Sequence, residues 1–178
     1  ENILVGLFNL RSGLRELVMQ EIKNAKQGLP ASITLKMNSL QDKEMINLLY
    51  EASQAGVKID LIIRGICCLV PGLQGISENI RVISIVDRFL EHSRIFVFHN
   101  NGDTKVYLSS ADWMVRNLYH RIETRFPVYD TFAIKTILDF LSIQMKDNVK
   151  ARIIDVEQKN SYQFESSNPV SYTHLRAH

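Results

Sequence analysis

The first half of the chain alternates short apolar runs with longer segments whose apolar residues recur at helical spacing. Residues 4–8 form a short apolar run, and the apolar side chains of residues 10–25 then recur every three or four positions. Residues 33–37 alternate apolar with polar side chains, residues 45–52 return to helical spacing, and residues 57–63 are almost continuously apolar. This strand-helix-strand-helix-strand order with short connections predicts a sheet with parallel strands that helices cover.

The second half contains further strand patterns and one more helical period. An Asn-Gly dipeptide at Asn101-Gly102 predicts a hairpin between two of these strands. The predicted strands fall at residues 82–86, 95–98, 105–108 and 151–156, and the predicted helix falls at residues 134–145. We therefore expect an α/β fold with a mixed, mostly parallel sheet flanked by helices.

The composition excludes several classes of protein. With 46% hydrophobic and 22% charged residues, the chain can bury a core and is not disordered as a whole. No apolar run approaches the roughly 20 residues that a membrane-spanning helix needs, and we expect no secretory signal at the start. The 21 basic and 19 acidic residues give a net charge of +2, which excludes a strongly basic surface but not a local basic site. The adjacent Cys67 and Cys68 favour a reducing compartment.

The chain divides into one folded unit and a tail. Periodicity and apolar character persist to about residue 158 and are then lost. We predict a domain over residues 1–160 and a polar tail over residues 161–178, in which residues 170–178 resemble a non-native cloning scar.

Several common phosphate and hydrolase motifs are missing from the sequence. The eight glycines are too scattered for G-x-G-x-x-G, and there is no G-x-x-x-x-G-K-[ST], H-E-x-x-H or G-x-S-x-G. Any phosphate chemistry here is therefore not built on a P-loop or a dinucleotide fingerprint.

Arg64 is the first candidate for a functional residue. It directly follows the apolar run 57–63, at the carboxyl end of a predicted strand, where open α/β sheets bind their ligands. Its planar fork suits phosphate oxygens. The structural alternative is an ion pair with a carboxylate such as Asp60 or Glu91.

His92 is the second candidate, just before the predicted strand 95–98. An imidazole with a pKa near 6.5 can act as acid, base or nucleophile. The alternative is a histidine at the surface or at the edge of the core.

Ser109, Ser110 and Asp112 form a third candidate group after the hairpin. Their hydroxyl groups could bind an anion or orient a histidine, although a Ser-Ser-x-Asp turn is also an ordinary helix cap.

Two short motifs together resemble one half of the phospholipase D pattern, which is H-x-K followed by G-S-x-N-W. The motifs here are His92-x-Arg94 and Ser109-Ser110-x-Asp112-Trp113. Arg94 replaces Lys and keeps the positive charge, whereas Ser109 replaces Gly. Asp112 replaces Asn and adds a negative charge, which suggests that it orients a histidine or an arginine rather than holding a phosphate.

Four longer strings, in order, closely resemble polyphosphate kinase of the large, histidine-phosphorylating bacterial type. They span residues 28–38, 63–67, 83–94 and 106–114. The resemblance covers residues 3 to about 160 and implies that this chain is the C-terminal phospholipase-D-like domain of a multidomain enzyme.

The resemblance also implies a function. That family transfers the terminal phosphoryl group of ATP reversibly to inorganic polyphosphate through a phosphohistidine, which lies in a preceding domain that this chain lacks. By resemblance, His92 is a second active-site histidine, Arg64 and His92 bind ATP phosphates, and Arg94, Ser109, Ser110 and Asp112 are supporting residues. Mg²⁺ is held mainly by phosphates and by groups outside this chain, so no metal ligand is assigned here.

The resemblance further implies the partners and the location of the protein. The partners are ATP or ADP, polyphosphate, the preceding domains and further copies in a homo-oligomer, without nucleic acid. The location is cytoplasmic, with peripheral association at the inner membrane as an alternative. The isolated chain would be inactive.

Two other functions stay open on the residues alone. One is a phospholipase-D-like phosphodiesterase or nuclease, which would need a dimer because the chain has one His-x-Arg copy. The other is a non-catalytic polyanion-binding module. Further basic residues could line a path for a polyanion or form a solvated face: Arg81, Arg88, Lys105, Arg116, Arg121 and Arg125.

Overall fold

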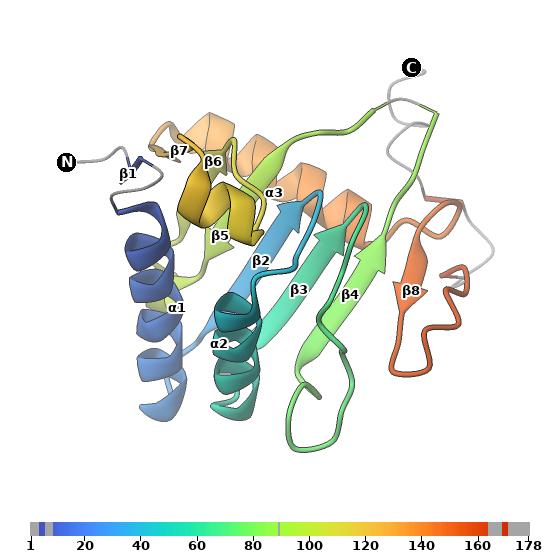
Figure 1. Cartoon of the computed structure of the whole chain (residues 1–178), viewed down its shortest axis with the longest axis horizontal. Coiled ribbons are helices and arrows are strands. Elements are labelled where there is room, and N and C mark those ends of the chain that lie inside the picture. Colours follow the sequence, from blue (N-terminus) through green and yellow to red (C-terminus); the bar gives the residue numbers. More distant parts are fainter. Residues whose placement is uncertain (1–3, 6–8, 89, 164–168, 171–178) are drawn as a thin grey trace.

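The computed structural model describes residues 4–5, 9–88, 90–163 and 169–170. These residues form an eight-stranded sheet in the order β1-β7-β6-β5-β2-β3-β4-β8, with α1 and α2 on one face and α3 on the other (Figure 1). The strands are β1 (Leu4–Val5), β2 (Ser32–Met37), β3 (Lys58–Ile63), β4 (Ile80–Ser84), β5 (Arg94–Phe98), β6 (Lys105–Ser109), β7 (Thr124–Val128) and β8 (Arg152–Ile154). The α-helices are α1 (Leu10–Lys26), α2 (Lys43–Gln54) and α3 (Thr131–Met145), and two short helical segments are η1 (Asn100–Gly102) and η2 (Arg116–His120).

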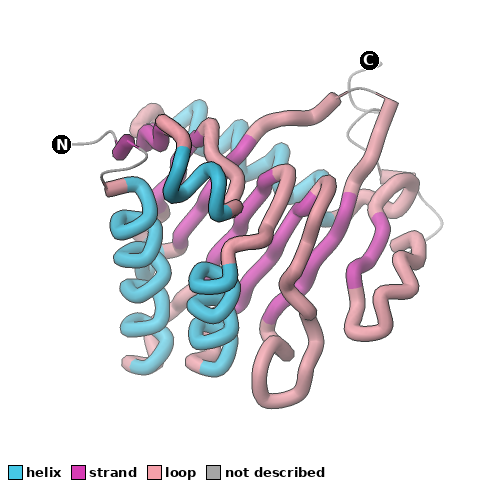
Figure 2. The backbone as a smooth tube through the Cα atoms, in the orientation of Figure 1, coloured by secondary structure: helices cyan, strands magenta, loops and turns pink. Residues whose placement is uncertain are grey.

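The sheet is mixed, as expected, but the prediction that most of it is parallel is wrong. Only the pairs β2–β3 and β3–β4 are parallel. The other five pairs are antiparallel. Helix α2 carries the chain from β2 to β3 and keeps the two strands parallel, whereas the chain returns from β4 to β5 without a helix (Figure 2). β5, β6 and β7 then follow one another in antiparallel pairing.

Most predicted elements are present, with one omission. The strands expected near residues 33–37, 57–63, 95–98 and 105–108 and all three helices are confirmed, and the strand expected at 82–86 begins earlier, at Ile80. The sequence reasoning missed β7, because Arg125 and Pro127 interrupt its apolar character. Of the segment 170–178, only residue 170 belongs to the described residues, and the domain boundary at residue 160 stays a prediction.

Each face of the sheet has its own apolar core. On the side of α1 and α2, Leu14, Leu35 and Leu49 are fully buried, and Phe96 meets Trp113 edge to face with the ring centres 5.8 Å apart. The core beneath α3 is smaller and contains Leu141 of that helix. Phe132 at the start of α3 is 79% exposed, so this helix covers its face of the sheet less completely.

The topology brings several strand ends together at one edge of the sheet. β2 and β3 end side by side, since Met37 is paired with Ile63. β5 begins at the same edge, because Lys36 of β2 is paired with Ile95, and Arg94 is paired with Ser109 at the end of β6. The residues that follow β2 and β3 therefore lie close to those that precede β5.

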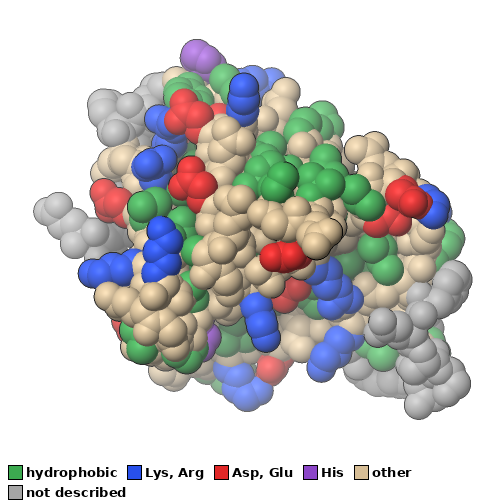
Figure 3. Space-filling view, turned by 90° about the horizontal axis from the view of Figure 1, so that it is seen from below, with side chains coloured by type: hydrophobic (Ala, Val, Ile, Leu, Met, Phe, Trp, Pro, Cys, Tyr) green, Lys and Arg blue, Asp and Glu red, His purple; other side chains and the backbone are tan. Residues whose placement is uncertain are grey.

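The opposite end of the molecule carries no single sign of charge. Lys and Arg side chains are interspersed with Asp and Glu side chains in the view from below (Figure 3). None of the helices within the described residues combines the length and the apolar character that crossing a bilayer requires.

Candidate functional site

Arg64 lies at the mouth of a cleft at the shared edge of the sheet. The cleft has a volume of about 470 Å³, and Lys36, Asn38, Arg64 and the segment 85–88 contribute to its walls. The Nε of Arg64 donates a hydrogen bond to Oδ1 of Asn38 at 2.8 Å, which fixes the side chain at the end of β3. Among the ion pairs of the described residues, none includes Arg64, so the expected alternatives with Asp60 and Glu91 are not formed.

Lys36 lines the same cleft, and the sequence reasoning missed it. Lys36 is only 5% exposed, and its ammonium lies 3.9 Å from the Glu91 carboxylate and 5.9 Å from the centre of the Phe140 ring. Burial lowers the pKa of Lys36; the nearby charge of Arg64 lowers it further, and Glu91 opposes the shift. The alternating pattern of residues 33–37 predicts that Lys36 faces solvent. The one sequence feature that could have placed Lys36 in a site is Arg64, which ends the neighbouring strand.

His92 lies on the exposed segment just before β5. Burial lowers its pKa first, the positive charges of Arg94, Arg64 and Lys36 lower it further, and Asp112 opposes them. These charges act on the imidazole because all of them lie at this edge of the sheet. At neutral pH the ring is therefore uncharged and can accept a proton.

Asp112 and Arg94 form a buried ion pair beside His92. The Nε and Nη2 of Arg94 donate to the two carboxylate oxygens of Asp112 at 3.2 and 3.0 Å. Asp112 also accepts hydrogen bonds from the backbone N–H groups of Asn38 at 2.7 Å and Ser39 at 3.2 Å. Nη1 of Arg94 donates to the carbonyl oxygen of His92 at 2.9 Å. The pair thus joins the end of β2 to the segment that carries the histidine.

The hydroxyl groups of Ser109 and Ser110 bind the neighbouring strand. Ser109 Oγ donates to the Thr124 carbonyl oxygen at 2.8 Å and accepts from the N–H of Ala111 at 3.1 Å. Ser110 Oγ bonds to the Glu123 carboxylate and accepts from the N–H of Thr124 at 3.1 Å. These bonds connect the ends of β6 and β7 and engage both hydroxyl groups in internal contacts.

Two of the other basic residues, Arg81 and Arg121, contact groups within the chain. Arg81 donates to the Met145 carbonyl oxygen and to Gln163, and Arg121 forms an ion pair with Glu123 at 3.6 Å. Within the described part of the chain, no group of three or more His, Cys, Asp or Glu side chains could hold a metal ion. The cleft contains the basic residues Lys36, Arg64 and Arg88, and its carboxylates Glu91 and Asp87 are paired with Lys36 and Lys150. The guanidinium of Arg64 in this cleft suits an anion such as a phosphate.

Comparison with known proteins agrees on one family. The model of the family described as polyphosphate kinase C-terminal domain 2 matches residues 3–172. A polyphosphate kinase of Vibrio vulnificus is 58% identical over 161 residues, which cover 90% of this chain and 23% of that protein. The chain thus spans about a quarter of the length of the curated relatives that it matches.

Solved structures agree with this result. The crystal structure of polyphosphate kinase from Porphyromonas gingivalis is 49% identical and matches with a TM-score of 0.94, over 99% of this chain and 28% of that one. Nuc from Salmonella typhimurium, a phospholipase D family member, matches with a TM-score of 0.57 at 14% identity, over 86% of this chain and 97% of that one. The second likeness shows the fold alone, and it confirms the expected phospholipase-D-like architecture.

Proposed function

This chain belongs to the polyphosphate kinase family, and we propose that it supplies one wall of a site that moves the terminal phosphoryl group of ATP reversibly onto inorganic polyphosphate. The observation that carries the proposal is the cleft that Lys36 and Arg64 line, together with His92, which lies close enough for both charges to lower the pKa of its imidazole. The histidine that becomes phosphorylated would lie in a preceding domain outside this chain.

In this proposal, Arg64 and Lys36 hold the phosphate oxygens. Phosphoryl transfer depends mainly on positioning and on positive groups near the oxygens where charge accumulates. The Arg64 fork is oriented by Asn38, so it can present its remaining donors to two phosphate oxygens. Lys36 is buried in the wall of the same cleft, with its ammonium 3.9 Å from the Glu91 carboxylate, and adds a second positive charge.

His92 is proposed to act as the base, and then as the acid, for the proton of the attacking group. Its lowered pKa keeps the imidazole neutral at pH 7, so one ring nitrogen can take up the proton that the attacking histidine of the preceding domain loses and can pass it to the phosphate oxygen that leaves. The cations that lower its pKa also make its protonated form a stronger acid. Asp112 and Arg94 act as positioning residues, because their ion pair holds the His92 carbonyl oxygen in place.

The nucleotide and its metal ion fit this division of roles. ATP brings phosphate oxygens that two cationic side chains can bind. We propose that Mg²⁺ is bound by those oxygens and by groups outside this chain, where it neutralises part of the phosphate charge. The further partners are polyphosphate, ADP, the other domains of the enzyme and additional copies in a homo-oligomer. The proposed location is cytoplasmic, with peripheral binding at the inner membrane as the alternative.

A chimera tests the function directly. The matching segment of the Vibrio vulnificus polyphosphate kinase is replaced by this chain, and ATP-dependent polyphosphate synthesis is measured. We expect the chimera to be active, and His92→Ala and Arg64→Ala to lower the rate by at least about a hundredfold. His99→Asn is the matched control, since His99 lies at the opposite end of β5, where its ring accepts a hydrogen bond from the nearby Gly102.

Two results would contradict the proposal. The first is synthesis that persists in His92→Ala. The second is an inactive chimera together with hydrolysis of a chromogenic phosphodiester by this chain, which would indicate a phosphodiesterase that acts as a dimer. Polyphosphate binding that neither substitution changes would instead indicate a polyanion-binding module.

A further inference from the structure

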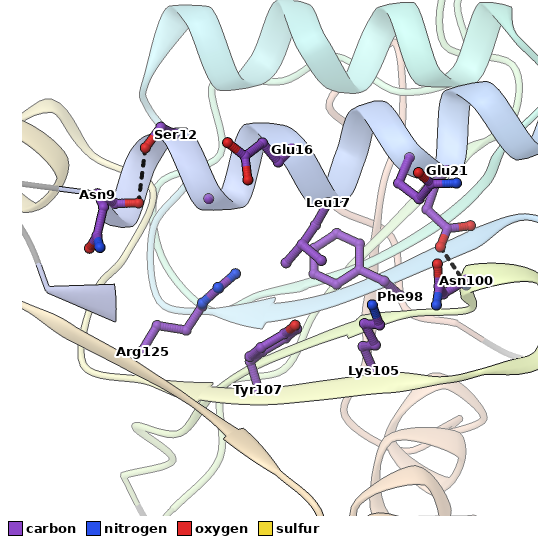
Figure 4. A pocket seen from close by; sticks show the side chains of 12 residues that line it. Asn9, Ser12, Glu16, Leu17, Glu21, Phe98, Asn100, Lys105, Tyr107 and Arg125 are labelled. Atoms are coloured by element: carbon purple, nitrogen blue, oxygen red, sulfur yellow. Dashed lines mark hydrogen bonds between the residues drawn. The ribbon is translucent and has the colours of Figure 1, made fainter. Parts of the chain in front are cut away.

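A second pocket lies between the start of α1 and the strands β5, β6 and β7, apart from the cleft of Arg64. Its volume is about 490 Å³. Figure 4 shows that its walls come from α1 on one side and from the three strands on the other. The residues that matter for its chemistry are Ser12, Gly13, Glu16, Lys105, Tyr107 and Arg125.

Arg125 is the most unusual of these residues. It is only 5% exposed, yet its Nε and Nη1 have no hydrogen-bond partner. Its guanidinium lies 4.0 Å above the centre of the Tyr107 ring and points from β7 toward the first turns of α1 (Figure 4). Buried arginines are normally paired, because an unpaired buried donor loses its hydrogen bonds to water without replacement. Arg125 therefore lacks an acceptor that the pocket has room to admit.

One side of α1, beginning with its first two turns, forms a wall of the same pocket. This helix has 17 residues and no acidic residue in its first turn. The first N–H groups of a helix have no partner within it, and the helix dipole adds partial positive charge at this end. Ser12 and Gly13 of this first part of α1 line the pocket, and the N–H of Gly13 already donates to the Asn9 carbonyl oxygen at 2.9 Å, so the N–H groups without a helical partner are those that precede Gly13. Free N–H groups and a positive dipole at a helix start form a favourable place for an anion.

The remaining charges in the pocket do not cancel this preference. Lys105 is exposed and takes part in none of the ion pairs of the described residues. The Glu21 carboxylate is already bound to the backbone N–H groups of Ser32 and Asn100. Glu16 is exposed, and its charge acts on Arg125 without an ion pair. Glu16 therefore weakens the binding of an anion but does not satisfy the guanidinium.

The geometry points to a second phosphate-binding site. We propose that the pocket takes a phosphate group, whose oxygens accept from the Arg125 fork and from the first N–H groups of α1, while Lys105 adds charge at the rim. This site does not depend on the function proposed for Arg64 and His92. The phosphate can come from free orthophosphate or from a polyphosphate chain, and these two sources are distinguished by the test.

Phosphate titration followed by NMR tests the proposal at the level of single residues. The backbone amide signals of the 178-residue chain are recorded while orthophosphate, and separately tripolyphosphate, is added up to 10 mM. We expect the Ser12 and Gly13 amides to shift with a saturable curve. Arg125→Gln should raise the Kd at least about tenfold. Arg15→Gln is the matched control, because Arg15 is an exposed arginine of α1 outside the pocket, and it should leave the Kd unchanged.

A second variant keeps the test independent of any loss of folding in Arg125→Gln. Ser12→Glu places a carboxylate in the first turn of α1, where it can pair with Arg125 and suits the helix dipole. We expect this variant to have a higher Tm than wild type and to lose the phosphate-induced shifts.

The outcomes separate the sources and the two sites. Binding of tripolyphosphate at least about tenfold tighter than that of orthophosphate assigns the site to a polyphosphate chain, and equal affinities assign it to a single phosphate. The shifts at Ser12 and Gly13 should persist in Arg64→Gln, so a failure of the proposed function leaves them in place. Unmoved Ser12 and Gly13 amides, or a wild-type Kd in Arg125→Gln, would overturn the proposal.

Discussion

Arg94 and Arg125 lie at the same level of the sheet, on either side of β6, but they differ in their hydrogen-bond partners. Ser109 of β6 is paired with Arg94 on one side and with Arg125 on the other, so the two arginines start about 10 Å apart, which is two strand spacings. Arg94 donates to both oxygens of Asp112 and to the His92 carbonyl. Arg125 has two nitrogens without an acceptor and rests on the Tyr107 ring.

This difference indicates that Arg94 has a structural role, whereas Arg125 has donors that a ligand could use. The donors of Arg94 are used within the chain, so its charge positions the backbone near His92. The donors of Arg125 remain available beside a pocket. Four experiments test this contrast.

Replacing the acceptor of Arg94 should have the largest effect. Asp112→Ala leaves a buried arginine without its carboxylate and frees the N–H groups of Asn38 and Ser39, so we expect a loss of about 3–5 kcal/mol in the free energy of unfolding. Urea denaturation measures this loss. Asp139→Ala removes the carboxylate of an exposed i,i+4 pair and should cost less than about 0.5 kcal/mol. Equal losses in the two variants would refute the contrast.

Removing Arg94 itself should cost less. Arg94→Met leaves Asp112 buried, but the carboxylate keeps its bonds from two backbone N–H groups. We expect a loss of about 2–3 kcal/mol in the same denaturation experiment. A stability equal to wild type would show that the ion pair is dispensable.

Arg125→Met should change stability little or raise it. The substitution removes two unsatisfied donors and keeps an apolar stem against Tyr107, so we expect the free energy of unfolding to stay within about 1 kcal/mol of wild type or to increase. The matched comparison is Arg94→Met. A loss greater than about 2 kcal/mol would mean that Arg125 has a structural partner after all.

The smallest effect concerns the charge that reaches His92. We expect its pKa to lie below 6.5, to rise in Arg64→Gln because a nearby cation is removed, and to stay unchanged in Arg125→Gln. Titration of the His92 ring protons by NMR measures both shifts. Since the folded state then binds fewer protons than the unfolded state below pH 6.5, His92 should reduce stability as the pH falls through that value. If the pKa of His92 is the same in Arg64→Gln as in wild type, the charge of Arg64 does not reach the imidazole, and His92 does not belong to the same site as the cleft.

Some of the site could be predicted from the sequence because it follows from strand ends. Arg64 comes directly after an almost continuously apolar strand, and parallel strands place such residues at the edge of the sheet where ligands bind. Lys36 could not be predicted, because strand alternation assigns it to the solvent face and does not show which later segment covers that face. The strand order could not be predicted from the sequence either. Nothing in residues 85–93 indicates that β5 turns back beside β2 rather than continuing the parallel series.

The edge strands carry a consequence for how the chain is made. Leu4 of β1 is paired with Arg125 of β7, and β4 receives its last neighbour only when Ile154 of β8 is present. A ribosome therefore releases the central parallel strands long before either edge of the sheet can be covered. During that interval the exposed backbone of β4 can pair with other nascent chains. We expect the growing chain to need protection until β8 has left the ribosome.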